Sequence, residues 1–341
     1  MSINTRQTKI GVSYRKQSNL ATAQSAGNMW GLTKTGDNLM AVTLNSEDDS
    51  DDMGKGDEFP ANNYLTNWDV SGQYDKYLSS QWFAWAAAFC LGDITQTTAA
   101  SGPPAAYQYV CIPRAPGDGI ECDSFTIVEQ LGGVDRALVG CCAEGMTLQF
   151  NSGPGRANAK LIVDVVGTGK VTSPSSIVVP ATLTEKFLNA GGATVSFLGE
   201  SYSGGELVSV EWSWKNNIRL DTGFFIGSGT SNGGQIRGRM ETNKRECNMR
   251  FRVRLEAGSG EEAALLAQTE GAVEFTITGA LITGSSYNLA KVEMPRCVYS
   301  AAQVASENGL AVYDVTVKPM KDPSEEYVTL TAITTVANIG Q

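Results

Sequence analysis

The side chains that could do chemistry in this chain are its carboxylates and cysteines, because the 341 residues include no histidine. Without an imidazole, the chain has no Ser-His or Cys-His nucleophile, no histidine-containing metal site and no ordinary general base near neutral pH. A glycosidase would need only a pair of Asp or Glu side chains, but the acids of this chain cluster in segments that look like loops. We therefore expect no catalytic centre, no bound metal and no cofactor.

The seven cysteines are odd in number and include no C-x-x-C pair. Cys141 and Cys142 are adjacent, so in a strand they point to opposite faces. Cys111 and Cys122 could close a short loop under oxidation, but buried free thiols that pack as small apolar side chains are the favoured interpretation. A disulfide framework is not expected.

Charge and hydropathy limit the partners. The formal net charge of -10 argues against a protein that grips phosphates, since nucleic-acid affinity rests on Lys and Arg. The N-terminal segment lacks the apolar core of a secretory signal, and the longest apolar run, residues 82–91, is too short to cross a bilayer. We expect a protein that is made in a cytosol and has no membrane partner.

The 37 glycines, and the many short Val/Ile/Thr/Phe/Tyr runs between Gly, Asn, Asp and Ser, predict a mainly β fold. In the first half we expect a helix at residues 80–91 and strands at 38–45, 67–77, 107–113, 123–130, 146–150 and 160–166. In the second half we expect a helix at residues 261–269 and strands at 207–214, 248–256, 272–282, 287–295, 311–318 and 327–335. The helix follows the second strand in both halves.

This repeated order indicates a duplication. The chain is predicted to hold two similar β-sandwich or barrel-like domains, each with one flanking helix, at residues 38–170 and 205–341. Residues 1–37 would then form an N-terminal arm, and residues 171–204 a linker or crossover. Any β-rich chain can be divided into strands in this way, but a lone helix at the same place in each half is harder to obtain by chance.

Two segments carry a family resemblance. Residues 125–171, FTIVEQLGGVDRALVGCCAEGMTLQFNSGPGRANAKLIVDVVGTGKV, combine a strand, a tight turn, a Gly-Cys step into a second strand and an outgoing strand that ends in G-x-G. Residues 313–335, YDVTVKPMKDPSEEYVTLTAITT, look like a closing hairpin. Over most of residues 38–335 the chain resembles the major tail tube proteins of long-tailed, siphophage-like bacteriophages.

The resemblance implies a non-enzymatic virion protein of the phage tail, made in the host cytoplasm, whose rings stack into the conduit for DNA ejection. Its partners would be further copies of itself, the tape measure protein, the tail terminator and the distal tail proteins. Double-stranded DNA would pass through a net negative lumen without specific binding. Six tube domains usually make one ring in this family, so two domains per chain favour a trimeric ring with pseudo-sixfold symmetry over a hexamer.

The sequence leaves two other functions open. One is another structural protein with the tube fold, such as a tail terminator or a secretion-tube component. The other is a carbohydrate-binding β-sandwich with Trp68, Trp82 and Trp85 as sugar platforms. Aromatic side chains at positions 82, 85 and 89 follow helical spacing, which favours a face buried in the core.

Two loops that the duplication makes equivalent carry opposite charge. Residues 46–58 are strongly acidic, whereas residues 215–254 are net basic. The resemblance places both at the interface between stacked rings, where opposite charges would steer rings into register and phenylalanine side chains would add holding energy. Solvated loops are the alternative explanation. The expected inter-ring contacts are Glu47, Asp48, Asp49, Asp51, Asp52, Arg219, Phe224, Phe225, Arg237 and Arg239.

Overall fold

The fold was obtained as a computed structural model of the 341-residue chain. It describes residues 8–32, 39–48, 63–130, 135–151, 159–172, 179, 182–197, 200–202, 207–229, 234–255, 260–307, 309–324 and 326–341. Within these ranges the chain forms nineteen β-strands and two α-helices, so the prediction of a mainly β fold is confirmed.

The first half contributes nine strands and the longer helix. Their bounds are β1 Lys9–Ser13, β2 Met29–Gly31, β3 Ala41–Asp48, β4 Asn63–Tyr77, α1 Ser80–Leu91, β5 Gly92–Ala100, β6 Ala106–Pro113, β7 Ser124–Gln130, β8 Asp135–Asn151 and β9 Lys160–Thr172. The second half contributes ten strands and a short helix. Their bounds are β10 Ala193–Phe197, β11 Glu200–Tyr202, β12 Leu207–Lys215, β13 Phe224–Gly229, β14 Gln235–Arg237, β15 Glu246–Arg254, α2 Glu261–Leu266, β16 Glu270–Thr283, β17 Ser286–Glu307, β18 Leu310–Pro319 and β19 Thr329–Thr334.

Every element expected from the sequence overlaps an observed one, and α1 has the expected bounds. Helix α2 is shorter than expected because it ends at Leu266. The sequence pattern does not predict β1, β2, β5, β10, β11, β13 or β14. Strands β1 and β2 lie within the expected N-terminal arm, and β10 and β11 lie within the expected linker. The division at residues 38–170 and 205–341 therefore stays a prediction.

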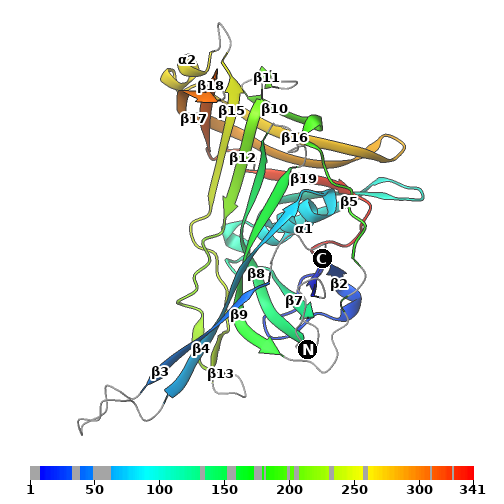
Figure 1. Ribbon diagram of the computed structural model, residues 1–341, viewed down its shortest axis with the longest axis vertical. Helices are drawn as coiled ribbons and strands as arrows, with labels where there is room; N and C mark the ends of the chain where they lie inside the picture. Colours follow the sequence, from blue (N-terminus) through cyan, green and yellow to red (C-terminus); the bar gives the residue numbers. More distant parts are fainter. Residues whose placement is uncertain are drawn as a thin grey trace, which may run out of the picture.

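Eight strands form one continuous antiparallel sheet in the order β3-β4-β9-β8-β12-β15-β18-β17, which we call the long sheet. The two halves meet where β8 pairs with β12, from Asn151 opposite Ser209 to Gly145 opposite Lys215. Figure 1 shows β4, β9, β8, β12 and β15 along the longest axis of the molecule. One face of the long sheet covers the core and includes the buried side chains of Leu148 and Trp212.

Each half adds a smaller outer sheet to the long sheet. In the first half the outer sheet runs β2-β1-β7-β8, and in the second half it runs β11-β10-β16-β17. Strands β8 and β17 thus belong to both kinds of sheet, because their first parts pair with the outer strands β7 and β16 and their later parts pair with the long-sheet strands β9 and β18. A further hairpin, β5-β6, is joined through β19 to β17.

The hydrogen-bonded strand order is the same in the two halves. The series β2-β1-β7-β8-β9-β4-β3 of the first half matches β11-β10-β16-β17-β18-β15-β12 of the second, and every neighbouring pair is antiparallel. The helix follows β4 in one half and β15 in the other. This correspondence includes β1 and β10, which lie outside the domain boundaries expected from the sequence.

The irregularities of the strands also match. The β7–β8 pairing shifts its register between Phe125 and Ile127, and the β16–β17 pairing shifts between Gly271 and Val273. Just beside these bulges, Cys141 and Cys297 each place Sγ 3.7 Å from a backbone oxygen three residues earlier, that of Leu138 and that of Met294. Bulges re-aim a strand, so bulges at equivalent positions indicate that β8 and β17 bend in the same way.

Helix α1 forms the centre of the core. Its first turn is capped by the Ser79 hydroxyl, which accepts from the Trp82 amide at 3.1 Å, and it ends at Gly92 with φ 92°. All twelve residues of α1 are buried, and the rings of Trp82 and Trp85 stack at 4.5 Å. A helix that is apolar on all sides has no solvent face. Neither helix of the described ranges is long and apolar enough to span a membrane.

Candidate functional site in the loops, edges and polar face

The acidic loop begins where β3 and β4 leave the body of the molecule. Its described members, Glu47 and Asp48, are exposed and pair with Tyr64 and Asn63 across the hairpin. The expected contacts Asp49, Asp51 and Asp52 lie outside the described residues. Figure 1 shows the ends of β3 and β4 projecting downward from the rest of the fold.

Strands β13 and β14 of the basic segment lie beside the described ends of β3 and β4. Strand β13 lies beside the lower ends of β3 and β4 in Figure 1, and β14 pairs with β4 at Gln235 and Asn67. A Cβ atom added to Gly234 would lie 2.9 Å from the ring of Trp68, so the two segments are in close contact. Part of the basic segment is therefore a neighbour of β4, the strand that follows the acidic loop, within one chain.

Arg237 holds these two segments together from the inside. It is 5% exposed, and its guanidinium donates to the carbonyl oxygens of Leu220 at 2.6 Å and Gly167 at 3.1 Å and forms an ion pair with Asp69. The guanidinium also lies 4.7 Å from the ring of Phe224. These contacts occupy the side chain within the chain, so Arg237 is a clamp between β14, β4 and β9.

The other expected contacts are more accessible. Phe225 is 46% exposed, and the Arg239 guanidinium lies 5.7 Å from its ring. Arg239 is itself exposed and lies 3.8 Å from Glu241. The exposed Arg219 bridges to Glu241 through its backbone and donates to Asn243 at 3.3 Å. These side chains are accessible, and Arg219 and Arg239 both lie next to Glu241.

The long sheet ends in two edges that the sequence analysis did not identify. Within the described residues, β3 pairs with β4 alone, and β17 beyond Val298 pairs with β18 alone. Val304 lies on the open edge of β17 and is 61% exposed, and Leu44 on β3 is also exposed. Open strand edges carry unpaired N–H and C=O groups that bind further strands. Which strand lies at an edge depends on the order of the sheet, and no local residue pattern gives that order.

The face of the long sheet opposite the core is polar, and several of its charges are paired. Lys160 Nζ lies 2.8 Å from Asp75, and Arg250 donates to Asp314 at 2.6 Å. Arg252 adds a contact of 3.1 Å to Asp314. The hydrogen bond from Arg250 is the largest cause that lowers the pKa of Asp314, so this carboxylate stays ionised.

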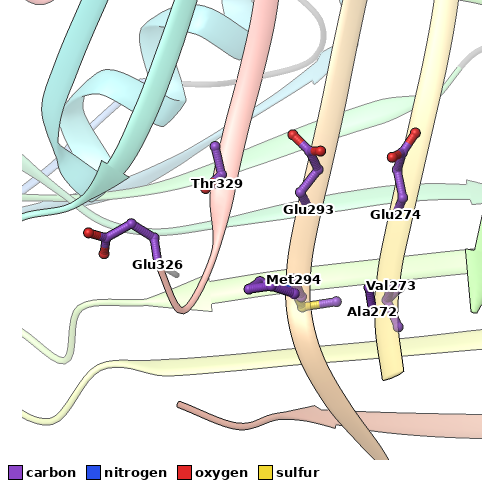
Figure 2. A pocket seen from close by; sticks show the side chains of 8 residues that line it. Ala272, Val273, Glu274, Glu293, Met294, Glu326 and Thr329 are labelled. Carbon is purple, nitrogen blue, oxygen red and sulfur yellow. The ribbon is translucent and has the colours of Figure 1, made fainter. Parts of the chain in front are cut away.

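A carboxylate pair does occur, in the outer sheet of the second half. Figure 2 shows Glu274 and Glu293 projecting in the same direction from adjacent strands, beside a pocket of about 170 Å³ that Glu326 and Thr329 also line. Lys291 bridges the two acids, with Nζ at 2.9 Å and 2.7 Å. Burial lowers the pKa of Lys291, but the hydrogen bonds with Glu293 and Glu274 outweigh it and leave the pKa raised. Both carboxylates of the pair are engaged by Lys291, which does not fit the free acid and base that a glycosidase needs.

The aromatic residues considered as sugar platforms do not form an exposed surface. Trp82 and Trp85 are fully buried in α1, and Trp68 is half-buried on β4. Among the described residues, no group of three or more Cys, Asp and Glu side chains could hold a metal ion. The described cysteines are all free, and all but Cys122 are buried. The expectation that the protein needs no cofactor stays a prediction.

A continuous sheet whose two outermost strands have open edges within the described residues, next to charged segments, defines a class of β-rich proteins with strand edges available for pairing. Residues 8–319 match the family described as phage tail tube protein, and the chain belongs to that family. No curated protein matches the chain. The family is structural, so the chain is a structural component of a phage tail tube.

Proposed function

We propose that this protein is the major tail tube subunit, whose rings stack into the conduit through which DNA is ejected. The observation that carries the proposal is the long sheet, which takes four strands from each half and ends in two open edges within the described residues. Joining the edges of successive chains closes a ring and satisfies the unpaired backbone groups. A heterologous interface of this kind gives a closed ring when its rotation allows closure.

The proposed ring contains three chains. The equal strand order of the two halves supports two tube domains per chain, and the resemblance gives six domains per ring. Three chains would then surround the axis with pseudo-sixfold symmetry. The tape measure protein, the tail terminator and the distal tail proteins are the proposed further partners. The family match favours the tube itself over a terminator or a secretion-tube component.

The polar face of the long sheet is proposed to line the lumen, because the core covers the other face. Its charges are mixed, so these residues do not support the expected net negative lumen. The arginines at positions 250 and 252 are instead held by Asp314, and Lys160 is held by Asp75. Basic side chains that already form ion pairs with carboxylates of the protein displace few counterions from DNA as it passes. DNA would therefore slide without specific binding.

The projecting loops are proposed to contact the adjacent ring. Exposed ion pairs are worth only about 0.2–1 kcal/mol each, so Glu47, Asp48 and their acidic neighbours would act mainly on the rate and register of stacking. The exposed ring of Phe225 would supply apolar contact area. Arg237 would act indirectly, because it fixes the base of both loops.

Electron microscopy of the purified protein, combined with native mass spectrometry of its rings, tests the assembly. Rings of three chains, and tubes made of such rings, are expected. A ring of six chains would contradict the two-domain proposal. Monomers that stay dispersed at high protein concentration would contradict the tube function itself.

A second experiment tests stacking. Neutralising the acidic loop with Glu47→Gln, Asp48→Asn, Asp49→Asn, Asp51→Asn and Asp52→Asn should slow tube growth at low salt, as followed by light scattering. The matched control is Asp93→Asn, Asp118→Asn, Glu262→Gln, Glu270→Gln and Glu326→Gln, which neutralises five exposed acids elsewhere. Raising the salt should slow the unmodified protein as the Debye length falls below roughly 8 Å. Equal growth rates for the loop variant and its control would leave solvated loops as the explanation.

A further inference from the structure

We infer that the open edge of β17, from Ala301 to Ser306, binds strand β3 of a second copy of this chain, antiparallel and in a register set by the β8–β12 junction. The inference rests on the proposed ring and specifies the contact that closes it. The junction inside the chain joins the end of the first half to the start of the second. The same junction, repeated at the end of the second half, requires the first long-sheet strand of another chain.

Strands β8 and β17 carry matching bulges. The β8–β9 pairing shifts its register between Ala143 and Gly145, and the β17–β18 pairing shifts between Tyr299 and Ala301. These bulges make Ala143 of β8 equivalent to Tyr299 of β17. Four residues further on, Thr147 is equivalent to Gln303. The matching cysteine contacts on the same two strands give the same alignment.

Strands β12 and β3 match in turn, through β15 and β4. Val165 and Val317 are equivalent because they face Ala143 and Tyr299 across the bulges. Val165 pairs with Gly72 on β4, and Val317 pairs with Met249 on β15. Strands β4 and β15 are thereby aligned, so that Ser71 is equivalent to Asn248.

The alignment then reaches the two outermost strands. Ser71 pairs with Ala41 on β3, whereas Asn248 pairs with Ser213 on β12. Ala41 therefore has the place in the first half that Ser213 has in the second.

The β8–β12 pairing can now be applied to β17 and to β3 of a second copy. Inside the chain, Ser213 lies opposite Thr147, whose equivalent is Gln303. The register therefore places Ala41 of a second copy opposite Gln303. The neighbouring pairs follow from the antiparallel ladder, with Val42 opposite Ala302 and Met40 opposite Val304.

The side chains on the core face fit this pairing. Inside the chain, Leu148 is fully buried and lies opposite Trp212. Its equivalent, Val304, is 61% exposed, and the equivalent of Trp212 is Met40. A large apolar side chain that is exposed on an open strand edge indicates a surface awaiting a partner. Pairing with β3 of another copy would remove Val304 from solvent, whereas Met40, which directly precedes β3, is already buried in the single chain.

One end of the junction differs. A Cβ atom added to Gly145 would lie 2.7 Å from the Trp214 carbonyl oxygen, so β8 and β12 approach very closely there. The equivalent residue of β17 is Ala301, which already has a Cβ atom. The contact between two copies must therefore be wider at Ala301 than inside the chain, and the pairs from Ala302 onward define the register.

Disulfide cross-linking tests the register. The double variant A41C/Q303C places one new cysteine on each strand, at positions that are exposed in the single chain. Directly opposite residues have Cβ atoms about 4.5–5.5 Å apart, close to what a disulfide needs, whereas diagonal neighbours are about 7–8 Å apart. Assembled A41C/Q303C should therefore link efficiently on mild oxidation, and the largest species on a non-reducing gel should be a trimer.

The matched control is A41C/A305C, which moves one cysteine two residues along the same face. It should link at least several-fold less than A41C/Q303C, and the unmodified protein, with its seven native cysteines, sets the background. Tubes that form without the A41C/Q303C link, or that link equally in the control, would overturn the register while leaving the tube function intact. Failure of the unmodified protein to form any ring would overturn both.

A blocking variant gives an independent readout. Val304→Asp should abolish rings and leave monomers whose melting temperature is unchanged, because Val304 is largely exposed in the single chain. The control, Leu281→Asp, alters a side chain that is 51% exposed on the β16–β17 hairpin, away from this edge, and should still assemble. Normal rings from Val304→Asp would contradict the inference.

Discussion

The two helices follow equivalent strands, yet they have opposite surroundings. All of α1 is buried, because β19 and β17 of the second half and β8 and β6 of the first cover it. Helix α2 packs on β17, and its Leu266 is 79% exposed. The second half completes the surroundings of the first half, but nothing in the described residues completes the second half in the same way.

The largest expected effect separates the two helices directly. Trp85→Ala in α1 should lower the free energy of unfolding by about 3–5 kcal/mol, because it removes a fully buried ring from the stack with Trp82. Leu266→Ala in α2 should change it by no more than about 0.5 kcal/mol, because the side chain is exposed. Urea unfolding of unassembled protein measures both values. Similar losses for the two variants would remove the contrast between buried and exposed helices.

A second prediction concerns equivalent positions on β4 and β15. Lys76 pairs with Leu161 on β9 and Val253 pairs with Tyr313 on β18, which makes Lys76 the equivalent of Val253. Lys76 is buried and lies 2.8 Å from the equally buried Glu185. Burial lowers the pKa of Lys76 more than Glu185 raises it.

Glu185→Ala should therefore lower the free energy of unfolding by about 3 kcal/mol, since it leaves the buried ammonium group of Lys76 without its carboxylate partner. The double variant Lys76→Val with Glu185→Leu, which makes the first half resemble the second, should recover most of that loss. Chemical denaturation of the single and double variants checks this prediction. A double variant as unstable as Glu185→Ala would show that the ion pair has no apolar substitute in this half.

The smallest expected effect is a pH dependence that the two halves share. Burial raises the pKa of the Cys297 thiol from 9.0 to about 12, and burial likewise raises the pKa of its equivalent, Cys141. The unfolded chain loses these protons first, so their contribution to stability is complete below pH 9 and is lost as the pH rises toward the folded pKa.

Each such thiol should lower the free energy of unfolding by roughly 1.4 kcal/mol per pH unit above its unfolded pKa. Cys297→Ala should make the decline between pH 9 and pH 10.5 shallower by about that amount. Met294→Leu is the control, because it alters the same buried site without removing a thiol. An unchanged slope in Cys297→Ala would show that this thiol does not contribute.

The elements whose signals are local can be predicted from the sequence. Ser79 and Gly92 cap α1, and the apolar residues between them leave no other interpretation, so the helix bounds were predicted correctly. Strands β1 and β10 were missed because they are five-residue strands within polar and Gly-rich stretches. Their role appears only through their pairing with β7 and β16.

The candidate site was predictable only in part, for a related physical reason. Charge counting identified the acidic and basic segments, but it gives no information on where a side chain points. Arg237 was grouped with Arg239, although one is buried as an internal clamp and the other is exposed. The open edges of β3 and β17 depend on the order of eight strands from both halves, which no short stretch of sequence contains.

The passage of β8 and β17 from an outer sheet into the long sheet affects how the wall of a tube would resist force. Each is a single covalent chain, 17 and 22 residues long, that passes from an outer sheet into the long sheet through bulges. In the proposed ring, a force that pulls the outer sheet away from the inner wall would load these two strands along their backbones, because each backbone joins the two sheets covalently. The outer sheet and the long sheet would then be two layers held together by the continuous backbones of β8 and β17. Separating the layers would require breaking the backbone hydrogen bonds of these strands along their paired length.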